Sequence, residues 1–455
     1  MESTILDNLE NFLAEAVGYV WGMPLVVLLV GSGLFFTLAL GFIQIRGFTH
    51  AIKVILGRYD NPNDPGEISH FQALTTALSA TVGLGNIAGV AFAVKAGGPG
   101  AVFWMIMTGL VGMATKYSEC SLAVMYRKID EHGEVHGGPM HYITRGLGQK
   151  FYPLAMIYSI CLISATFGAG NMFQTNQVAN ILNEGFSIPN WLTGLILAIL
   201  TAAVILGGIK RIGLVTSKLV PLMGGIYVLG ALLVIFLNFD KVGGLLYSII
   251  HDAFSGTAVA GGALGATIKI ALDEVIRQGV RRACFSNEAG LGSAPIAHAA
   301  AATNEPIREG VVALLEPLID TVVICTMTAL VILISGEWTN PDLNGVGLTA
   351  AAFDSAIPGF GKFFVPLAVF LFAYSTLLSW SYYGETMVDF VSKENKSKRN
   401  IFIYKLAFCF VGFLGSIWAI EPVLNFSDIM LGLMVIPNLL AVWLLFPKLR
   451  QATNE

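Results

Sequence analysis

The sequence predicts an all-α polytopic membrane protein with eleven membrane-spanning helices, ten of them arranged as a five-plus-five inverted repeat. Hydrophobic residues make up 55% of the 455 residues and charged residues only 12%, which is too little polar surface to cover a soluble globule of this size. Apolar runs of about 20 residues, the length of one bilayer crossing, recur along the chain. One glycine-rich pattern also occurs twice, as Ser79-Ala-Thr-Val-Gly-Leu-Gly-Asn86 and as Ser286-Asn-Glu-Ala-Gly-Leu-Gly-Ser293.

The repeated pattern predicts two broken helices. Gly83 and Gly85 align with Gly290 and Gly292 at one constant offset. Each glycine lowers helix propensity by about 1 kcal/mol, and backbone groups freed inside lipid must find partners in protein, water or ligand. Glycines two residues apart cannot form the single packing face of a small-xxx-small motif. We therefore expect both breaks to line a cavity, as corresponding broken helices do in secondary transporters.

Composition excludes other classes of protein. A net charge of -4 without a dense basic face argues against nucleic-acid binding. The cysteines are scattered and form no CxxC pair, which favours packing over disulfides or metal sites; they are Cys120, Cys161, Cys284, Cys325 and Cys409. Residues 1–20 lack the basic region of a secretory signal, and their apolar residues recur at helical spacing, which predicts an amphipathic interfacial helix.

Apolar runs place the spans in order along the chain. Helices 0 to 10 are expected at 24–44, 71–95, 100–126, 152–182, 190–208, 213–238, 280–303, 310–335, 363–391, 400–420 and 428–447. Helices 1 and 6 cross in opposite directions, because five spans separate their starts, so the repeat is inverted. The predicted organisation is an interfacial helix at 1–20, an extra span within 21–45, a first repeat at 71–238, an extracellular loop or lid at 239–279, a second repeat at 280–447 and a cytoplasmic tail at 448–455.

The basic residues predict the orientation. Most of the 26 Lys and Arg residues fall in the loops of one side, which the positive-inside rule assigns to the cytoplasm. The amino terminus is then outside and the carboxyl terminus inside. Residues 336–362 are predicted to form a second external segment that covers the bundle, in addition to the loop 239–279.

Long motifs carry a family resemblance. The segments Phe285-Ser-Asn-Glu-Ala-Gly-Leu-Gly-Ser-Ala-Pro-Ile-Ala-His298, Gly137-Gly-Pro-Met-His-Tyr-Ile143, Gly168-Ala-Gly-Asn-Met-Phe-Gln174, Leu315-Glu-Pro-Leu-Ile-Asp320 and Tyr374-Ser-Thr-Leu-Leu-Ser-Trp-Ser-Tyr-Tyr-Gly-Glu385 resemble the signature of the alanine-or-glycine:cation symporter family. The match covers nearly the whole chain. A more distant similarity reaches amino-acid transporters of the leucine-transporter type, whose helix 1 break is identical to Val82-Gly-Leu-Gly-Asn86.

The resemblance implies a leucine-transporter-type fold and roles for several residues. Phe285 aligns with an aromatic gate and Ser286 with a substrate- and sodium-contacting position. Thr81 stands where those transporters often have alanine, and Asp320 replaces a neutral sodium ligand of helix 7. Leu377 falls at one hydroxyl position of the second sodium site, which leaves the helix 8 ligands open among Ser375, Thr376 and Ser379.

A zwitterionic amino acid needs donors for its carboxylate and acceptors for its ammonium group, which broken helices supply largely through backbone. In helix 3, Asn171 and Gln174 are three residues apart and are expected to share one polar face, with interhelical hydrogen bonding as the alternative. The expected substrate-binding residues are Thr81, Leu84, Gly85, Gly168, Gly170, Asn171, Gln174, Phe285, Ser286, Gly290, Leu291 and Trp380.

Sodium is a hard cation that prefers oxygen ligands. Asn86, Thr81 and Ser286 are expected to form one site, and the carbonyls of Ser79 and Val82 with helix 8 hydroxyls a second. The complete expected set is Ser79, Thr81, Val82, Asn86, Ser286, Asp320, Ser375, Thr376 and Ser379. Sodium is the only expected cofactor.

Charged residues at membrane depth are functional hypotheses by default. Glu288, inside the second break, is expected to be an architectural carboxylate. Glu385 is a further functional candidate. Ion coupling and a structural role remain open for Glu316 and Asp320, and Lys116 is expected to pair with Glu119 on the same helix. The loop histidines His132, His136 and His141 are expected to be solvated and not to bind metal.

The sequence thus predicts a sodium-coupled symporter that imports small neutral amino acids by alternating access across the cytoplasmic membrane, and not an enzyme. Alanine, glycine and D-alanine are the candidate substrates, and a proton-coupled or broader carrier on the same fold is the alternative. An intramembrane enzyme would need a nucleophile with its base, or a metal set, and no GxSxG or HExxH motif is present. A channel would show a repeated filter or charge ring. The preferred amino acid, its enantiomer, the ion stoichiometry and the oligomeric state stay open.

Overall fold

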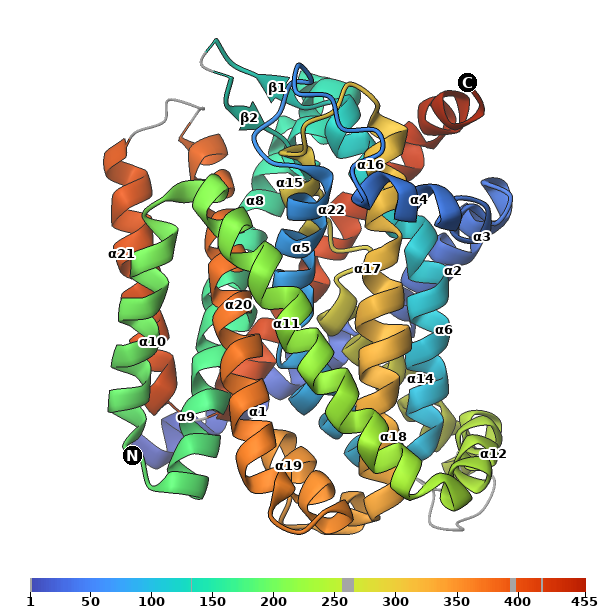
Figure 1. Ribbon diagram of the computed structural model, residues 1–455, viewed down its shortest axis with the longest axis vertical. Coiled ribbons are helices and arrows are strands. Elements are labelled where there is room, and N and C mark those ends of the chain that lie inside the picture. The colour runs from blue at the N-terminus through green and yellow to red at the C-terminus, as the bar shows by residue number, and fades with distance from the viewer. Residues whose placement is uncertain (1, 132, 256–265, 393–397, 419) are drawn as a thin grey trace.

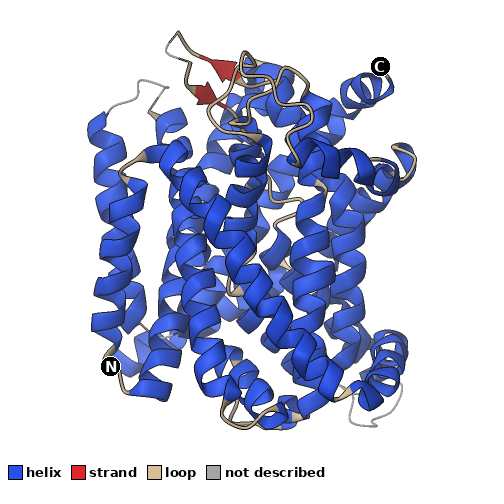
Figure 2. Cartoon of the chain, viewed as in Figure 1, coloured by secondary structure: helices blue, strands red, loops and turns tan. Residues whose placement is uncertain are grey.

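The computed structural model describes residues 2–131, 133–255, 266–392, 398–418 and 420–455. Its described part is a bundle of helices with one two-stranded hairpin at one end (Figure 2). By length and composition, seven helical segments within these ranges are apolar enough to cross a membrane, or eight if the first bent pair counts as one span. The chain is thus a multi-pass membrane protein, and the count of eleven spans stays a prediction.

The amino-terminal helices are α1 (Glu2–Val20), α2 (Met23–Ala39), α3 (Ile43–Arg46) and α4 (Phe48–Ile55). The axes of α1 and α2 differ by 42°, and α2 begins with Pro24 in its first turn, where proline is tolerated. The predicted span 24–44 is too long. Gly41 and Phe42 both adopt left-handed backbone conformations (φ 59° and 57°). A right-handed helix needs φ near about −60° at every residue, so the helix ends at Ala39.

The first predicted break is present. The helix α5 (His70–Thr81) is capped by Ser69, whose hydroxyl accepts from the amide of Gln72 while the Gln72 side chain returns to the Ser69 amide. Residues 82–84 are not helical; a π-helical turn, η1 (Gly85–Gly89), then leads into α6 (Val90–Met125). Within α6, Gly98 takes a non-helical conformation before Pro99. The predicted helices 1 and 2 therefore meet at a sharp kink without a loop.

The first half continues with short elements and four longer helices. These are β1 (Lys128–Ile129) and the antiparallel β2 (Val135–His136), α7 (Pro139–His141), η2 (Tyr142–Gly146), η3 (Gln149–Phe151), α8 (Tyr152–Phe167), the π-helical turn η4 (Gly168–Met172), α9 (Phe173–Phe186), α10 (Asn190–Ile205) and α11 (Gly208–Leu237). The segments α8, η4 and α9 form the predicted helix 3.

The second half begins with α12 (Phe239–Ser255) and α14 (Ala266–Asn287). It continues with α15 (Ala294–Ala299), α16 (Pro306–Ala313), α17 (Leu315–Pro317), the π-helical turn η5 (Leu318–Cys325), α18 (Thr326–Ser335), η6 (Glu337–Thr339) and α19 (Gly345–Ala356). The second break lies between α14 and α15, where Glu288, Gly290 and Gly292 have φ values of 56°, 90° and 78°. Glycine is the residue for which such values cost least, so both glycines are required by the backbone here.

Three long helices end the chain: α20 (Phe360–Val391), α21 (Lys398–Ile417) and α22 (Ile420–Asn454). Two predicted boundaries are wrong. Within the described residues, helix 6 already runs from Ala266 and not only from 280, so part of the predicted loop 239–279 is helical. The last helix runs without a break from the predicted span 428–447 into the predicted tail; it continues through Pro447 because its apolar residues, such as Leu449, remain buried beyond that point.

The long helices run roughly along one axis (Figure 1). The helix α14 packs along α6, and α5 packs between α11 and α20. Helices α10 and α21 lie side by side at one edge. The helices α12 and α19 cover one end of the bundle, and the β-hairpin and the end of α22 lie at the other (Figure 1). Both breaks therefore lie between the two ends, surrounded by α6, α8, α20 and α22.

Candidate functional site

The two helix breaks lie against each other in the middle of the bundle. A side chain at Gly85 would meet the Cα atom of Ser286 at 3.0 Å, and one at Gly83 would collide with the hydroxyl of Thr376 in α20. All four residues are buried. The glycines of the first break thus allow the close approach of the second break and of α20.

Side chains satisfy the freed backbone groups of the first break. The Asn86 side-chain oxygen accepts from the Gly83 amide (2.8 Å), and the Gln174 oxygen from the Leu84 amide (3.3 Å). Val82 keeps a helical hydrogen bond to Leu78. Unpaired backbone amides inside a membrane are costly, so these amide side chains stabilise the break.

The second break is held in the same way, by residues distant in sequence. The amide nitrogen of Asn438 donates to the Gly290 carbonyl (2.9 Å), and the hydroxyl of Tyr158 donates to the Leu291 carbonyl (3.1 Å). The Glu288 carboxylate accepts from the Ser293 hydroxyl. Tyr158 and Asn438 had not been identified from the sequence, since neither belongs to a glycine-rich motif.

Asp320 joins the two breaks. Its carboxylate, placed by the π-helical turn η5, accepts from the Asn86 side-chain amide (2.6 Å), the Ser286 hydroxyl (3.0 Å) and the Thr321 hydroxyl (2.6 Å). The side chain is fully buried. The structure therefore brings together two of the three residues expected to form the first sodium site, Asn86 and Ser286, with Asp320 of helix 7. It turns the hydroxyl of the third, Thr81, back toward the carbonyls of Ala77 and Leu78.

The expected second sodium group also comes together around α20. The Ser79 hydroxyl donates to the Ser375 carbonyl (2.5 Å), and the Ser375 hydroxyl lies 3.4 Å from the Ser79 carbonyl. The Thr376 hydroxyl faces Gly83. The Ser379 hydroxyl is buried and has no hydrogen-bond partner among the described residues. Two helix 8 candidates, Ser375 and Thr376, therefore contact or face the first broken helix. The third, Ser379, lies one helical turn further along α20.

The expected polar face of helix 3 is divided. Gln174 faces the first break, and Gly170 contacts Trp380, whose ring nitrogen donates to the Ala80 carbonyl at 3.4 Å. Asn171 instead donates to the Phe408 carbonyl of α21 (2.6 Å). The π-helical turn η4 is the reason: its i→i+5 hydrogen bonding changes the angular register, so residues three apart no longer share a face. Gly168 likewise lies against Phe426 and Ser427 of α22 and not against a break.

One end of the site is closed by aromatic and charged groups. Phe285 packs edge-on against Phe173 with ring centroids 5.3 Å apart, and the Arg282 guanidinium lies 5.6 Å from the Phe285 ring. Arg282 forms a buried ion pair with Asp428 (3.0 Å) and lines a cavity of about 240 Å³ with Lys95, Arg281 and Glu421. The predicted gate residue Phe285 therefore packs against one member of a buried ion pair, which no sequence motif indicates.

A second cavity, of about 510 Å³, lies at the carboxyl-terminal end of α20. It is lined by Glu67, His136, Tyr382, Glu385, Asp389 and Lys405. Glu385 pairs with Lys405 (2.9 Å) and so lies away from the breaks. The expected solvated state of the loop histidines is wrong for His136 and His141, because both are buried and His136 lies 3.0 Å from Asp389. His132 lies outside the described residues.

The expected pair between Lys116 and Glu119 is not formed. The Lys116 ammonium lies 3.2 Å from Glu316 of α17, and Glu119 accepts from the Asn438 side chain. Residues three apart on one helix can meet, but here two different helices offer each group a partner. Glu316 also contacts His298, so it belongs to a network separate from Asp320.

Arg282 provides a prediction about stability. Replacing Arg282 with alanine is expected to destabilise the protein by about 3–5 kcal/mol, because it leaves the buried Asp428 carboxylate without its main partner. The measurement is thermal unfolding in detergent. The double variant R282A/D428N should recover part of the loss, and Arg281→Ala, whose nitrogen lies 3.9 Å from Asp428, should lose less. Equal unfolding temperatures for R282A and the parent would contradict this role of the ion pair.

Apolar helices with two adjacent breaks, lined by buried amide, hydroxyl and carboxylate groups, define a secondary transporter. The model of the sodium:alanine symporter family matches residues 6–455, and the chain belongs to this family. It is therefore a sodium-coupled amino-acid symporter and not an enzyme.

Relatives support the same family. The chain is 44% identical over 432 residues to the sodium/alanine symporter AgcS of Methanococcus maripaludis, covering 94% of this chain and 92% of that protein. It is 37% identical to the Bacillus subtilis protein named "Probable sodium/glutamine symporter GlnT", covering 98% and 91%. The crystal structure of MhsT in complex with L-phenylalanine matches with a TM-score of 0.55 at 12% identity, covering 84% of this chain and 99% of that chain. The chain thus shares the fold of MhsT.

Proposed function

We propose that this protein imports small neutral amino acids, with alanine and glycine as preferred substrates and D-alanine as a further candidate, together with sodium. The observation that carries the proposal is the contact of Asp320 with both breaks, through Asn86 at 2.6 Å and Ser286 at 3.0 Å. A cation bound there would contact the oxygen atoms of Asp320 and Ser286, and it would contact the Asn86 oxygen once the amide turned that oxygen from Gly83 toward the cation. The name of the M. maripaludis relative supports alanine as the substrate.

Sodium and substrate would share the space between the breaks. The oxygens of Asn86, Ser286 and Asp320 are the hard ligands that sodium prefers, and Ser79, Val82, Ser375, Thr376 and Ser379 offer a second set. Backbone groups of Leu84, Gly85, Gly290 and Leu291 would hold the carboxylate and ammonium groups of the amino acid. Because the two ligands are adjacent, each would raise the affinity for the other by the same factor.

The proposed transport cycle uses two inverted repeats, at 71–238 and 280–447. One repeat would move against the other and open the site alternately to each side of the cytoplasmic membrane. The segment 1–20 would lie in the membrane interface, the span within 21–45 would be additional, 239–279 would act as an extracellular lid and 448–455 as the cytoplasmic end. The position of α1 at the end that carries α12 and α19, opposite the end of α22 (Figure 1), supports placing the two termini on opposite sides, and the basic loops would place the amino terminus outside.

Uptake into reconstituted vesicles tests the proposed function. Labelled alanine should accumulate with an inward sodium gradient and not without one. A pocket bounded by Thr81, Phe285 and Leu291 should admit a methyl side chain but little more, because overpacking costs about 1–3 kcal/mol, or roughly 5- to 150-fold in affinity.

The specificity is measured by competition against labelled alanine, with glycine, serine, D-alanine, valine, glutamine and leucine as competitors. If leucine or glutamine competes as well as alanine, the small-pocket proposal is wrong and a broader carrier takes its place, the alternative that the GlnT relative suggests. If a proton gradient alone drives uptake, sodium is not the obligatory coupling ion.

The orientation can be tested with single cysteines at two exposed positions. A cysteine at Asp342, before α19, should react with membrane-impermeant maleimide in intact cells, and one at Lys398, at the start of α21, should react only with permeant reagent. The parent protein measures the background of its native cysteines. Impermeant labelling of Lys398→Cys and protection of Asp342→Cys would reverse the orientation.

A further inference from the structure

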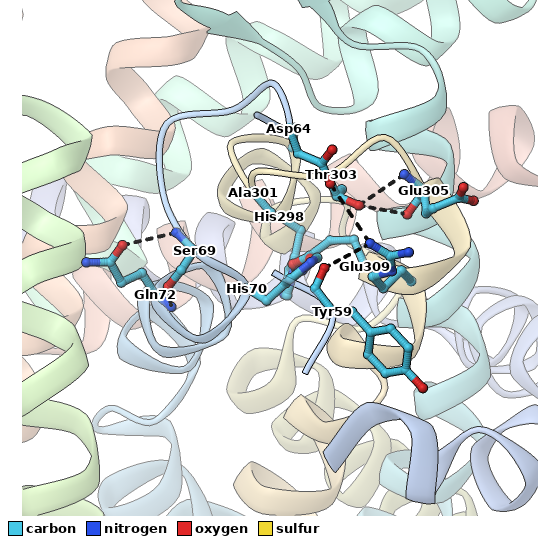
Figure 3. A network of polar contacts seen from close by, with 12 residues as sticks. Tyr59, Asp64, Ser69, His70, Gln72, His298, Ala301, Thr303, Glu305 and Glu309 are labelled. Atoms are coloured by element: carbon cyan, nitrogen blue, oxygen red, sulfur yellow. Dashed lines mark hydrogen bonds and ion pairs between the residues drawn. The ribbon is translucent and has the colours of Figure 1, made fainter. Parts of the chain in front are cut away.

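Five buried side chains form a continuous line of charged and titratable groups outside the sodium and substrate sites. His70 contacts Glu309 through its Nδ1 atom, the other oxygen of Glu309 lies 2.5 Å from Nδ1 of His298, and Nε2 of His298 lies 2.5 Å from Glu316. Glu316 in turn lies 3.2 Å from Lys116. Each of the five is at most 1% exposed. We call this set the buried ionic line; Figure 3 shows His70, Glu309 and His298 converging in it.

The line connects the parts that alternating access would separate. His70 is the first residue of α5, the helix before the first break, and His298 lies in α15, after the second break. Glu309 and Glu316 belong to α16 and α17, and Lys116 to α6. Hydrogen bonds to the carbonyl groups at the end of α15 join the same elements. The Glu67 amide donates to the Ala300 carbonyl (2.8 Å), and the Arg127 guanidinium donates to the Ala299 and Ala301 carbonyls (2.6 Å each).

The geometry at His298 requires an additional proton. A neutral imidazole has one N–H donor and one lone pair. Both ring nitrogens of His298 lie 2.5 Å from carboxylate oxygens, so a neutral ring would direct its lone pair at a carboxylate. An imidazolium instead donates to both carboxylates in charge-assisted hydrogen bonds.

The charge balance gives the same result. Lys116 and a protonated His298 carry two positive charges, and Glu309 and Glu316 carry two negative charges, so the line is neutral when His70 is neutral. Without the proton on His298 the line would carry one uncompensated negative charge in a fully buried position, and buried charge without a partner is strongly destabilising.

His70 provides a path for the proton. When its Nδ1–H donates to Glu309, its Nε2 atom has a free lone pair, and Nε2 has no hydrogen-bond partner among the described residues. His70 follows the loop 56–69, whose residues 57–63 are exposed. A proton from hydronium can bind Nε2 while the Nδ1 proton passes to Glu309 and on to His298; only N–H and O–H bonds form and break.

We propose that the buried ionic line is a proton-binding site: His298 holds a proton while this end of the transporter is closed and releases it through Glu309 and His70 when the end opens. The proposal rests on the proposed function, because it assumes that the two broken helices separate at this end during transport. Opening would admit water and weaken both contacts of His298. Closure and protonation would then favour each other.

A metal ion is a poorer occupant of the same place. The sulfur of Cys120 and atoms of His298 and Glu316 lie within 4.8 Å of one another. However, both nitrogens of His298 already contact carboxylates, and the Lys116 ammonium contacts Glu316, which opposes a second cation. A proton satisfies all of these contacts at once.

The surrounding titratable and charged groups come from every neighbouring element. They are Asp60 and Asp64 in the loop before α5, Arg308 in α16, Arg127 after α6, Glu119 and Cys120 in α6, Glu288 in the second break and Tyr383 in α20. None of them contacts either ring nitrogen of His298, so they change its electrostatic surroundings without replacing its two partners.

Imidazole ¹⁵N NMR tests the protonation state without requiring transport. The chain has only seven histidines, so the signal that is absent in His298→Gln identifies His298. We expect the parent at pH 7 to show two protonated ring nitrogens for this residue. A neutral-imidazole pattern at pH 7 would overturn the proposal, whether or not the protein transports alanine.

The pH dependence of sodium-driven alanine uptake, measured with equal pH on both sides, tests the link to transport. In the parent, uptake should fall on the alkaline side by about tenfold per pH unit, the slope for loss of one proton. His298→Gln should have low uptake without this alkaline decrease. In the double variant H298Q/E309Q the buried ionic line is neutral without the extra proton, because the positive charge of Lys116 balances the negative charge of Glu316. This variant should recover uptake and should not show the alkaline decrease.

His50 supplies the matched control. It lies on the same end, in α4, and its ring packs against Tyr59 with centroids 4.8 Å apart. His50→Gln should keep the parent's pH profile. An unchanged alkaline decrease in H298Q/E309Q would overturn the proton site, whereas absence of sodium-driven uptake in the parent at every pH would instead overturn the proposed function.

Discussion

Replacing Asp320 with asparagine is expected to reduce sodium-driven uptake by about 100-fold or more. Its carboxylate accepts three side-chain hydrogen bonds, from Asn86, Ser286 and Thr321, and hydrogen bonds to charged groups contribute about 1.5–3 kcal/mol each. The oxygen of an amide could still accept from Asn86 and Ser286, which both donate to Oδ1, but the amide carries no negative charge for the proposed cation. Removing one charged partner of a buried pair costs about 3–5 kcal/mol, or roughly 150- to 5,000-fold.

The measurement is the sodium concentration needed for half-maximal alanine uptake, together with the maximal rate. Thr321→Val is the graded control: it removes one donor to the carboxylate but keeps the negative charge, and should cost about 1.5–3 kcal/mol, or roughly 10- to 150-fold. Asp320→Asn should also require more sodium for half-maximal uptake, because it removes a negative charge from a cation site. If this variant inserts normally and keeps the parent's sodium dependence, Asp320 is structural and the coupling ion binds elsewhere.

The breaks were predictable from the sequence because their cause is local. Closely spaced glycines within an apolar run raise the free energy of a continuous helix. The structure accordingly has non-helical backbone at 82–84 and 288–293. The residues that complete the breaks were not predictable in the same way. Tyr158 and Asn438 reach Leu291 and Gly290 from helices more than 100 residues away in sequence, and no periodic pattern marks such partners.

Errors in the predicted site also have a physical cause. Asn171 was expected beside Gln174 because residues three apart share a face of an α-helix, but η4 is π-helical and changes that register. Lys116 was expected beside Glu119 for the same reason, yet tertiary partners on α17 and α22 take both side chains. Short-range spacing therefore identifies which residues are polar and buried, but the neighbouring helices decide where each side chain points.

Gly83→Ala is expected to abolish most transport, by about 10- to 100-fold, although the change adds one methyl group. The new Cβ atom would collide with the Thr376 hydroxyl and approach the Gln174 oxygen to 3.5 Å. Overpacking of a filled core costs about 1–3 kcal/mol, and the strain would fall between the first break and α20, where the second cation site is proposed. Reduced uptake and a lower thermal unfolding temperature should appear together.

Gly89→Ala is the matched control, because Gly89 is buried four residues after Gly85 and an added Cβ meets only the Leu84 carbonyl at 3.9 Å. It should leave uptake near the parent's level and stabilise the helix slightly, by about 0.4–1 kcal/mol. The double variant G83A/T376A separates packing from ion binding: removing the hydroxyl should restore thermal stability but not transport, since Thr376 is a proposed cation ligand. Recovery of both would assign Thr376 a packing role alone. Normal uptake by Gly83→Ala itself would show that the first break and α20 move apart readily at this contact.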